Sequence, residues 1–400
     1  MSNEEQGHRW EPPAPSQLPE IRAELIDHYG GEPALVTMRE ALRAGRSNIV
    51  PEVPGLDASP DAVAAQILVR SERRRLADAR LYYATADMTA LALAAAQTPP
   101  HEPVSLSRPP SEAGLMLFAE PIGGYVEDVG AALASTMAAR SGVDVKVTTP
   151  IVGVSWSVWT PDAVQLDRGT VEWLWNRQGE GVGRIPRTYR GLWVTFYSPR
   201  GLFSGLAPDT VIGTMRDGTV MTAGMVESGG REAGTPLLGW DNEILLAEGG
   251  ALGPAQPDTT DLWTHVLYSA WQLIAVEGRS RWAEVEEIPR PRAGAKRDAR
   301  QGITAPGTVR VVHVHSARRP PRQRVAEDAA ASSGRREPQW SCRWPVSPHR
   351  RDHCMNPARH AEGDCQHEER LIPGYVKGPE DKPLRVRETV HLWDRQPDEQ

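Results

Sequence analysis

Apolar residues in the first quarter of the chain recur at helical spacing. The segment 16–31 predicts a short helix closed by two glycines. A second pattern starts at Ser59, which can cap a helix with a proline in its first turn, and it runs without a helix breaker to a Thr-Pro-Pro sequence. It predicts either one long helix or two helices with a kink near Thr85. We therefore expect a helical region over 15–100, preceded by a disordered lead at 1–14.

Between 104 and about 250 the pattern changes to short runs rich in Val, Trp and Thr, which Gly, Pro and Asp separate at hairpin-like spacing. The expected strands are 114–121, 143–159, 163–175, 191–199 and 210–215, with one helix at 126–142 among them. Most of the connections are too short for repeated βαβ crossovers. We therefore expect a mainly antiparallel sheet with packed helices, within a domain that spans 101–289.

Another helix is expected at 260–278, because its large apolar residues recur at three- and four-residue steps. The residues of this apolar face are Trp263, Leu267, Ala270, Trp271 and Ile274. Beyond the helix, 290–339 is expected to hold a basic strand at 308–316 and a flexible linker. The last part, 340–400, is expected to be a small basic β-rich module that ends in a strand. The fold class predicted from these elements is α+β.

Tryptophan is frequent in the expected strands, at positions 156, 159, 173, 175 and 193. These side chains could stack on a ligand. Core or cross-strand packing is the interpretation we favour, because strand alternation places Trp173 and Trp175 on one face of the sheet.

The centre of the expected long helix is charged. Its arginines are Arg70, Arg73, Arg74, Arg75 and Arg80. They could contact nucleic acid. A solvated helix face, with Glu72, Asp78 and Asp87 as partners, is the interpretation we favour.

Charge is distributed unevenly along the chain. The formal net charge is −7, yet residues 290–377 carry 18 Lys and Arg against 9 Asp and Glu, a net of +9. The other residues then carry −16. A basic segment attached to an acidic body indicates either an anionic partner or docking of the segment on its own body or on another protein. The charge count leaves both open.

Membrane segments are not expected. The N-terminal residues are polar, and the longest run of small apolar residues, 90–96, is too short to span a bilayer. We expect a cytoplasmic protein, in which the three cysteines stay reduced.

Seven candidate zinc ligands lie close together near the C-terminal end. They are Cys342, His349, His353, Cys354, His360, Cys365 and His367. A structural zinc site draws paired ligands from tight turns such as C-x2-C, and no such pair occurs here. We therefore expect no cofactor; a zinc site formed by Cys342, Cys354, Cys365 and His367 is the weaker alternative. A His313-x-His315 pair on one face of a strand could also hold a metal, but an exposed polar strand face is the interpretation we favour.

Phosphate binding is the second interpretation of this segment. Its donors are Arg343, Arg350, Arg351 and Lys377, and its aromatic faces are Trp344 and Tyr375. Guanidinium groups match phosphate oxygens in pairs, and aromatic rings offer a surface on which bases stack. The combination predicts contact with RNA or DNA.

Catalysis on the bound phosphate is a further possibility. In a metal-independent ribonuclease, His349 would take the 2′-hydroxyl proton, Tyr375 or Lys377 would protonate the leaving oxygen, and Arg351 or Arg350 would stabilise the developing charge. Binding without catalysis is the interpretation we favour. The sequence has no P-loop, no dinucleotide-binding glycine pattern, no H-E-x-x-H and no G-x-S-x-G.

Two blocks of this segment resemble a known pattern. The residues R-W-P-V at 343–346, followed by His349 and Arg351, and Y-V-K-G-P at 375–379 are similar to a C-terminal tail of uncharacterised proteins of actinobacteria, their phages and plasmids. Pro348 stands where that tail has a glycine, and Arg350 replaces its tryptophan. The resemblance implies a mobile-element or phage-related context. With the charge pattern, it predicts a cytoplasmic protein that contacts nucleic acid through its C-terminal module.

Overall fold

The computed structural model describes most of the first 290 residues and several later segments. The described residues are 10–98, 102–128, 146–163, 170–177, 181–199, 207–215, 217–232, 236–254, 256–277, 282–289, 291–294, 296, 308–315, 342–346, 349–356, 367–372, 375–379, 382 and 389–393. Helices and strands are mixed, and the α+β class is confirmed. Two compact units divide the chain. Unit 1 comprises 1–288, 311–316 and 389–400, and unit 2 comprises 289–310 and 317–388.

A strand interrupts the expected long helix. The first elements are η1 (Pro15–Gln17), α1 (Leu18–His28), α2 (Glu32–Arg43), β1 (Ile49–Glu52), α3 (Pro60–Asp78), β2 (Arg80–Ala84) and α4 (Ala86–Ala96). The prediction of one long helix is therefore wrong. The alternative of two helices is right in the number of helices, but a strand and not a kink separates them, and the second helix begins after Thr85. Ala79 leaves the helical conformation with a ψ of 131°, and the next five residues form β2. The last four residues of β2 are buried, so pairing within a sheet outweighs their helical propensity.

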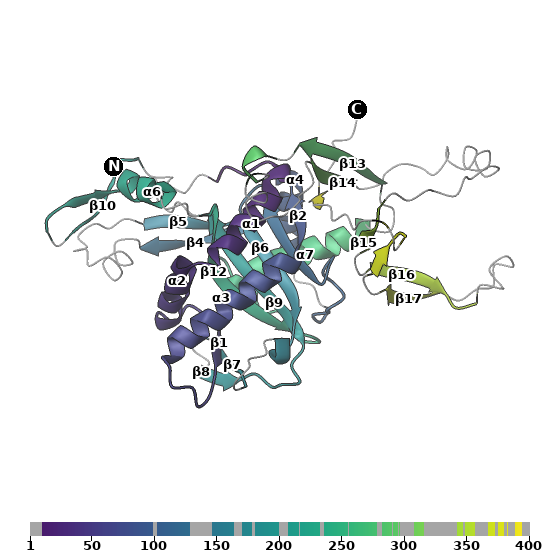
Figure 1. Ribbon diagram of the computed structural model, residues 1–400, viewed down its shortest axis with the longest axis horizontal. Coiled ribbons are helices and arrows are strands. Elements are labelled where there is room, and N and C mark those ends of the chain that lie inside the picture. Colours follow the sequence, from purple (N-terminus) through teal and green to yellow (C-terminus); the bar gives the residue numbers. More distant parts are fainter. Residues whose placement is uncertain are drawn as a thin grey trace. The chain divides into compact units, whose positions relative to one another are not determined.

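The central sheet of unit 1 is mixed. Its remaining strands are β3 (Ala113–Phe118), β6 (Gly153–Trp159), β9 (Gly191–Pro199), β12 (Leu238–Ala247), β13 (Trp282–Pro289), β14 (Thr308–His315) and β19 (Thr389–Trp393). The strand order is β12-β9-β6-β3-β2-β19-β14-β13 (Figure 1). From β12 to β3 the neighbours are antiparallel, but β2 runs parallel to both β3 and β19. Among the strand pairs whose direction is defined, the sheet is mainly antiparallel, as expected, and the two parallel pairs of β2 are the exception. Helix α4 supplies the crossover that the parallel β2–β3 pair needs.

Smaller elements surround this sheet. They are β4 (Gly123–Asp128), β5 (Lys146–Ile151), η2 (Pro161–Ala163), β7 (Glu172–Arg177), β8 (Gly181–Arg184), β10 (Val211–Thr214), β11 (Val220–Thr222), α6 (Ala223–Glu232) and α7 (Thr260–Glu277). Strands β1, β7 and β8 form a three-stranded sheet, and β4 pairs with β5. The expected helix at 126–142 is wrong in its first three residues, which belong to β4; the rest of it lies outside the described residues. The strand expected at 191–199 is confirmed as β9.

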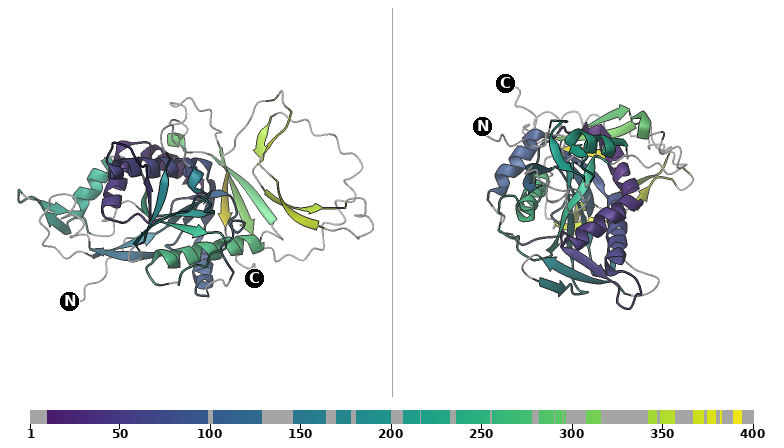
Figure 2. Two further views of the ribbon diagram at one scale, coloured as in Figure 1. Left: turned by 90° about the horizontal axis from the view of Figure 1, so that it is seen from below. Right: turned by 90° about the vertical axis from the view of Figure 1, so that its left-hand side faces the viewer.

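Helices cover both faces of the central sheet. In Figure 2, α1 and α3 lie over one face, and α4 and α7 lie over the other. The second face holds an extensive apolar cluster, in which Met116, Val194 and Trp271 are fully buried. The predicted apolar face of α7 is confirmed, since all five of its residues belong to this cluster. A Cβ atom on Gly114 would overlap the Trp156 ring, so only glycine fits at that point of β3.

The tryptophans of the strands pack together. Trp159, Trp173 and Trp193 meet edge to face, with ring centroids 5.1–5.7 Å apart. All three are buried, as is Trp156, while Trp175 is partly buried against the ring of Tyr189. The packing interpretation of these residues is confirmed.

Unit 2 contains two separate strand pairs in its described part. Strand β15 (Trp344–Val346) is antiparallel to β18 (Tyr375–Lys377), and β16 (His349–Cys354) is antiparallel to β17 (His367–Ile372). The final strand, which we expected in the C-terminal module, is β19 of the central sheet. It pairs with β2 in the register Val390–Leu81 and Trp393–Ala84. No helix in the described segments has both the length and the hydropathy that crossing a bilayer requires.

Candidate functional site

The residues predicted to act together in unit 2 lie on different strand pairs. His349, Arg350 and Arg351 belong to β16, which pairs with β17. Tyr375 and Lys377 belong to β18, which pairs with β15. The register places Trp344 directly opposite Lys377, so these two phosphate-binding candidates are neighbours. Strand pairing does not bring His349 to Tyr375 or Lys377, as the proposed ribonuclease site would require.

Three residues of this region illustrate its local surroundings. The Arg343 side chain donates a hydrogen bond from Nε to the carbonyl oxygen of Lys382, at 2.8 Å, and it is partly buried. The Lys377 side chain is exposed. Gly378 has a φ of 115°, and a Cβ there would lie 2.7 Å from the carbonyl oxygen of Cys342. Glycine at this position therefore lets the chain after β18 approach the start of β15.

Several of the predicted side chains are not among those that the structure describes. They are the side chains of Trp344, His349, Arg350, Arg351 and Tyr375, whose strands and register alone are defined.

The candidate zinc ligands are only partly described. Cys342 and Cys354 are free thiols, each partly buried, and Cys354 lies opposite His367 in the β16–β17 register. Cys365 lies outside the described residues. Within the described segments, no three or more His, Cys, Asp and Glu side chains gather in a way that could hold a metal ion.

The division of charge follows the division into units. Unit 2 contains 21 Lys and Arg against 12 Asp and Glu, a net of +9. Unit 1 contains the remaining 24 and 40, a net of −16. The basic segment recognised in the sequence is therefore a compact body with its own strand pairs.

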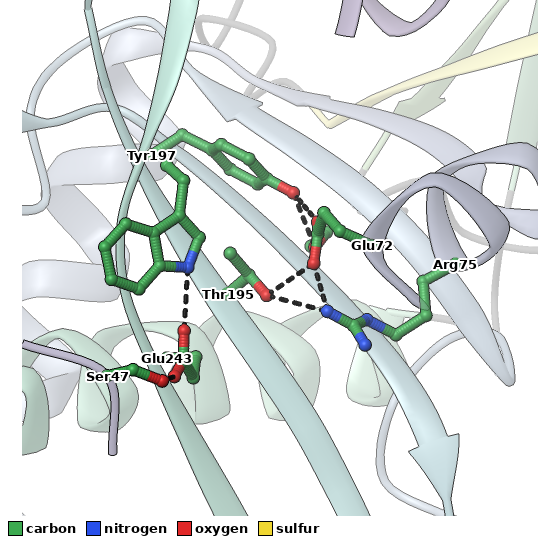
Figure 3. A network of polar contacts seen from close by, with 8 residues as sticks. Ser47, Glu72, Arg75, Thr195, Tyr197 and Glu243 are labelled. Carbon is green, nitrogen blue, oxygen red and sulfur yellow. Dashed lines mark hydrogen bonds and ion pairs between the residues drawn. The ribbon is translucent and has the colours of Figure 1, made fainter. Parts of the chain in front are cut away.

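A second cluster of chemically active residues lies inside unit 1. Glu72 and Arg75 of α3 form a buried ion pair, one turn apart on the side of the helix that faces the sheet (Figure 3). Their side chains are 2% and 9% exposed. The solvated face expected for these two residues is wrong, whereas Arg70, Arg73 and Arg74 of the same helix are exposed.

The Glu72 carboxyl group is surrounded by donors. It accepts hydrogen bonds from Arg75 and from Thr195 Oγ1 (3.0 Å), Ser155 Oγ (3.2 Å) and the Tyr197 hydroxyl. Four donors suit an ionised carboxylate, because a carboxylic acid would need one of its oxygens to donate. The guanidinium carbon of Arg75 lies 4.2 Å above the centre of the Trp193 ring, which adds a cation–π contact.

Strand register extends this cluster across the sheet. Glu243 of β12 lies opposite Thr195 of β9, which lies opposite Ser155 of β6. Beyond Ser155 the same row continues through Leu115 of β3 and Leu81 of β2. The row is thus polar over three strands and apolar over the next two, and all of these residues are buried.

Burial changes the acid–base behaviour of this cluster. Burial away from water raises the pKa of Glu243 from 4.5 to about 7, although hydrogen bonds from Ser47 and Trp240 oppose this effect. Burial, together with the neighbouring Glu72 charge, also raises the pKa of Tyr197 well above 10. The cluster can hold protons. Glu72 and Glu243 are both buried, so a substrate could not reach them without rearrangement.

One sequence signal pointed to part of this cluster. Glu72 and Arg75 fall at helical spacing from buried Ala65, Leu68 and Leu76, so charges occupy the apolar face of α3. Nothing in the sequence around Glu243 marks it as buried.

Comparison of the chain with models of protein families, with curated proteins and with solved structures finds no match.

Proposed function

We propose that this is a cytoplasmic nucleic-acid-binding protein whose contacts come from unit 2. The observation that carries the proposal is the match between charge and structure: a net of +9 falls on one compact unit and −16 on the other. A polyanion is attracted to the first and repelled by the second, so the charge distribution would orient it on unit 2.

The strand pairs of unit 2 support the same proposal. Lys377 is exposed, and its neighbour across the β15–β18 pair is Trp344. A cation beside an indole is a combination that binds phosphate and stacks on a base. The resemblance of the 343–346 and 375–379 blocks to a tail of phage and plasmid proteins agrees with a nucleic-acid partner in a mobile-element context.

The test is the salt dependence of binding by the full chain. We expect fluorescence anisotropy with labelled single-stranded RNA and duplex DNA to show affinity that falls linearly on a log–log plot against salt, because bound counterions are released. Replacing Arg350 and Arg351 by Gln should reduce that slope by roughly 2, at about 1 per lost phosphate contact. The matched control is Arg70→Gln with Arg73→Gln, which removes two exposed arginines from unit 1 and should leave the slope unchanged.

Two results would contradict the proposal. Binding that is absent, or that does not change with salt, would favour a protein partner or docking of unit 2 on acidic protein surfaces. A slope that falls in the control but not in the Arg350 and Arg351 variant would show that unit 1, and not unit 2, supplies the contacts. The ribonuclease alternative is tested separately by incubating the same samples in EDTA. Cleavage of the RNA that is lost in the His349→Ala variant would support this alternative.

A further inference from the structure

Glu243 sits at a junction between two sheets of unit 1. It lies on β12, the edge strand of the central sheet, directly after a bulge between Trp240 and Asn242. Its Oε1 is 2.6 Å from Ser47 Oγ, and its Oε2 accepts a hydrogen bond from Trp240 Nε1 at 2.7 Å. Ser47 comes two residues before β1, the first strand of the β1–β7–β8 sheet. The carboxyl group therefore touches the segment that leads into the second sheet.

The hydroxyl group of Ser47 is shared between two oxygens. Its Oγ is 2.6 Å from Glu243 Oε1 and 2.8 Å from the carbonyl oxygen of Ile49. The carbonyl can only accept, and the hydroxyl has a single proton to donate. If Ser47 donates to Ile49, then the contact with Glu243 needs its proton from the carboxyl group. All three hydrogen bonds are then satisfied at once: Trp240 donates to Glu243, Glu243 donates to Ser47, and Ser47 donates to Ile49.

We propose that the folded protein binds one proton at Glu243, and that release of this proton turns the Ser47 hydroxyl from Ile49 to Glu243. The reaction is a simple dissociation. The carboxyl O–H bond breaks, the proton leaves to solvent, and the electron pair stays on the carboxylate. Ser47 keeps its own proton and rotates to donate it to the new charge. The carbonyl oxygen of Ile49 loses that hydrogen bond.

Two charged side chains of α3, Arg75 and Glu72, act on Glu243, and their effects on its pKa partly cancel. Arg75 favours the ionised carboxylate, whereas Glu72 disfavours it. Arg75 is already held by Glu72 and stacked on Trp193, so it is not free to turn fully to Glu243. Across β9, Tyr197 donates to Glu72 and is itself kept neutral by burial. Burial is therefore the largest influence, and it raises the pKa of Glu243 to about 7.

The proton on Glu243 would affect the junction between the central sheet and the β1–β7–β8 sheet. Next to Ser47, Asn48 donates from Nδ2 to the carbonyl oxygen of Glu243 at 2.7 Å and to Asn242 Oδ1 at 2.9 Å. Asn176 of β7 donates to the carbonyl oxygen of Ser47 at 3.1 Å. Ser47 and Asn48 thus join β7 to the edge of the central sheet, and the hydroxyl that turns is part of this link. The structure consequently couples ionisation near neutral pH to the junction of the two sheets.

The variant Glu243→Gln tests the proposal on the full chain. Gln is a neutral match for the protonated acid, because its oxygen can accept from Trp240 while its amide nitrogen donates to Ser47. A group with a raised folded pKa contributes stability that is complete below the unfolded value of 4.5 and is lost as pH rises through about 7. The unfolding constant of the wild type, divided by that of Glu243→Gln, should therefore rise with pH across this window by roughly a few hundredfold and then level off. Urea unfolding at a series of pH values measures this ratio.

A matched control and a direct readout keep the test decisive. Glu248→Gln removes an exposed carboxyl group just after β12 and should leave the pH dependence as in the wild type. Infrared difference spectra of the wild type, on either side of a pH of about 7, should show the carbonyl band of a buried carboxylic acid that disappears at the higher pH. The proposal is overturned if that band is missing from the wild type or persists in Glu243→Gln. It is also overturned if the unfolding ratio stays constant with pH.

Discussion

Glu72 shows how a charge can be kept in the interior of this protein. Its two oxygens accept from one guanidinium and three hydroxyl groups, and those donors come from α3, β6 and β9. An ion pair buried in this way costs desolvation energy that its own contacts must offset, so it is sensitive to the loss of either partner. Through these contacts the pair connects α3 to β6 and β9.

Removing one member of the pair should be costly, and removing both should be tolerated better. Glu72→Leu leaves Arg75 as a buried charge without its carboxylate, and we expect a loss of roughly 3–5 kcal/mol in the free energy of unfolding. Glu72→Leu combined with Arg75→Met should recover most of that loss, since an apolar pair needs no desolvation. Urea unfolding of the single and double variants gives both values.

The exposed Glu40–Arg43 pair of α2 is the control for that experiment. Both side chains are about half exposed, and Glu40→Gln should cost under about 1 kcal/mol. For the buried pair, the single variants Glu72→Leu and Arg75→Met are compared with the double variant. If the double variant loses as much unfolding free energy as the two single variants together, then the charges of Glu72 and Arg75 do not depend on each other.

Strand β19 is the element that most changes the organisation expected from the sequence. It lies between β2 and β14 in the interior of the central sheet, and Val390, Leu392 and Trp393 are buried. Its residues therefore serve the core of unit 1, although they follow unit 2 in the chain.

A charge in this strand should unfold the sheet, whereas the same charge in unit 2 should be harmless. Val390 is fully buried on β19, and Val376 on β18 is 52% exposed. We expect Val390→Asp to lower the free energy of unfolding by several kcal/mol, because a carboxylate would enter an apolar site without a partner. Val376→Asp should change it by no more than roughly 0.5 kcal/mol. Circular dichroism during urea unfolding compares the two; equal stability would mean that β19 is not part of the core.

Local patterns predicted the elements better than they predicted their pairing. The helix at 260–278 and the strand at 191–199 follow from periodicity and β-propensity, which act within a few residues. Strand β2 was missed because Leu81 to Ala84 carry no breaker and continue a helical pattern, and only burial between β3 and β19 decides their conformation. Pairing of that kind depends on residues far away in the sequence, which no local pattern contains.

The candidate sites, too, could be predicted from the sequence only in part. Net charge is a sum over residues, so the basic character of unit 2 could be predicted from composition. Composition could not predict to which strand pair each cationic residue belongs, and His349 and Lys377 lie on different pairs. Glu72 could have been found from its place on the apolar face of α3. Glu243 could not, because its burial depends on distant residues such as Ser47, which only the fold brings to it.

At the scale of the whole molecule, unit 2 is not a simple C-terminal addition. The chain leaves unit 1 after 288, returns for 311–316, and returns again for 389–400. No single cut separates the two units, and a C-terminal fragment that carries β14 and β19 would lack β2, the other neighbour of β19. Binding experiments are therefore best made on the full chain.

Shortening the chain tests this organisation. A variant that ends at Glu388 lacks β19, and β2 then loses one of its two neighbours. We expect loss of the near-ultraviolet circular dichroism of the packed tryptophans and loss of cooperative unfolding. A peptide of residues 385–400 should restore part of the signal by adding the missing strand. An unchanged spectrum in the shortened chain would contradict the role given to β19.

The parallel pairing of β2 with β19 has a consequence for how the protein folds. The two strands, at 80–84 and 389–393, meet across most of the length of the chain. Closing so long a loop is slow. During synthesis, one edge of β2 stays unpaired until β19 has been synthesised. An unpaired edge favours association with other chains, so newly made copies should depend on chaperones more than the stability of the finished protein would suggest.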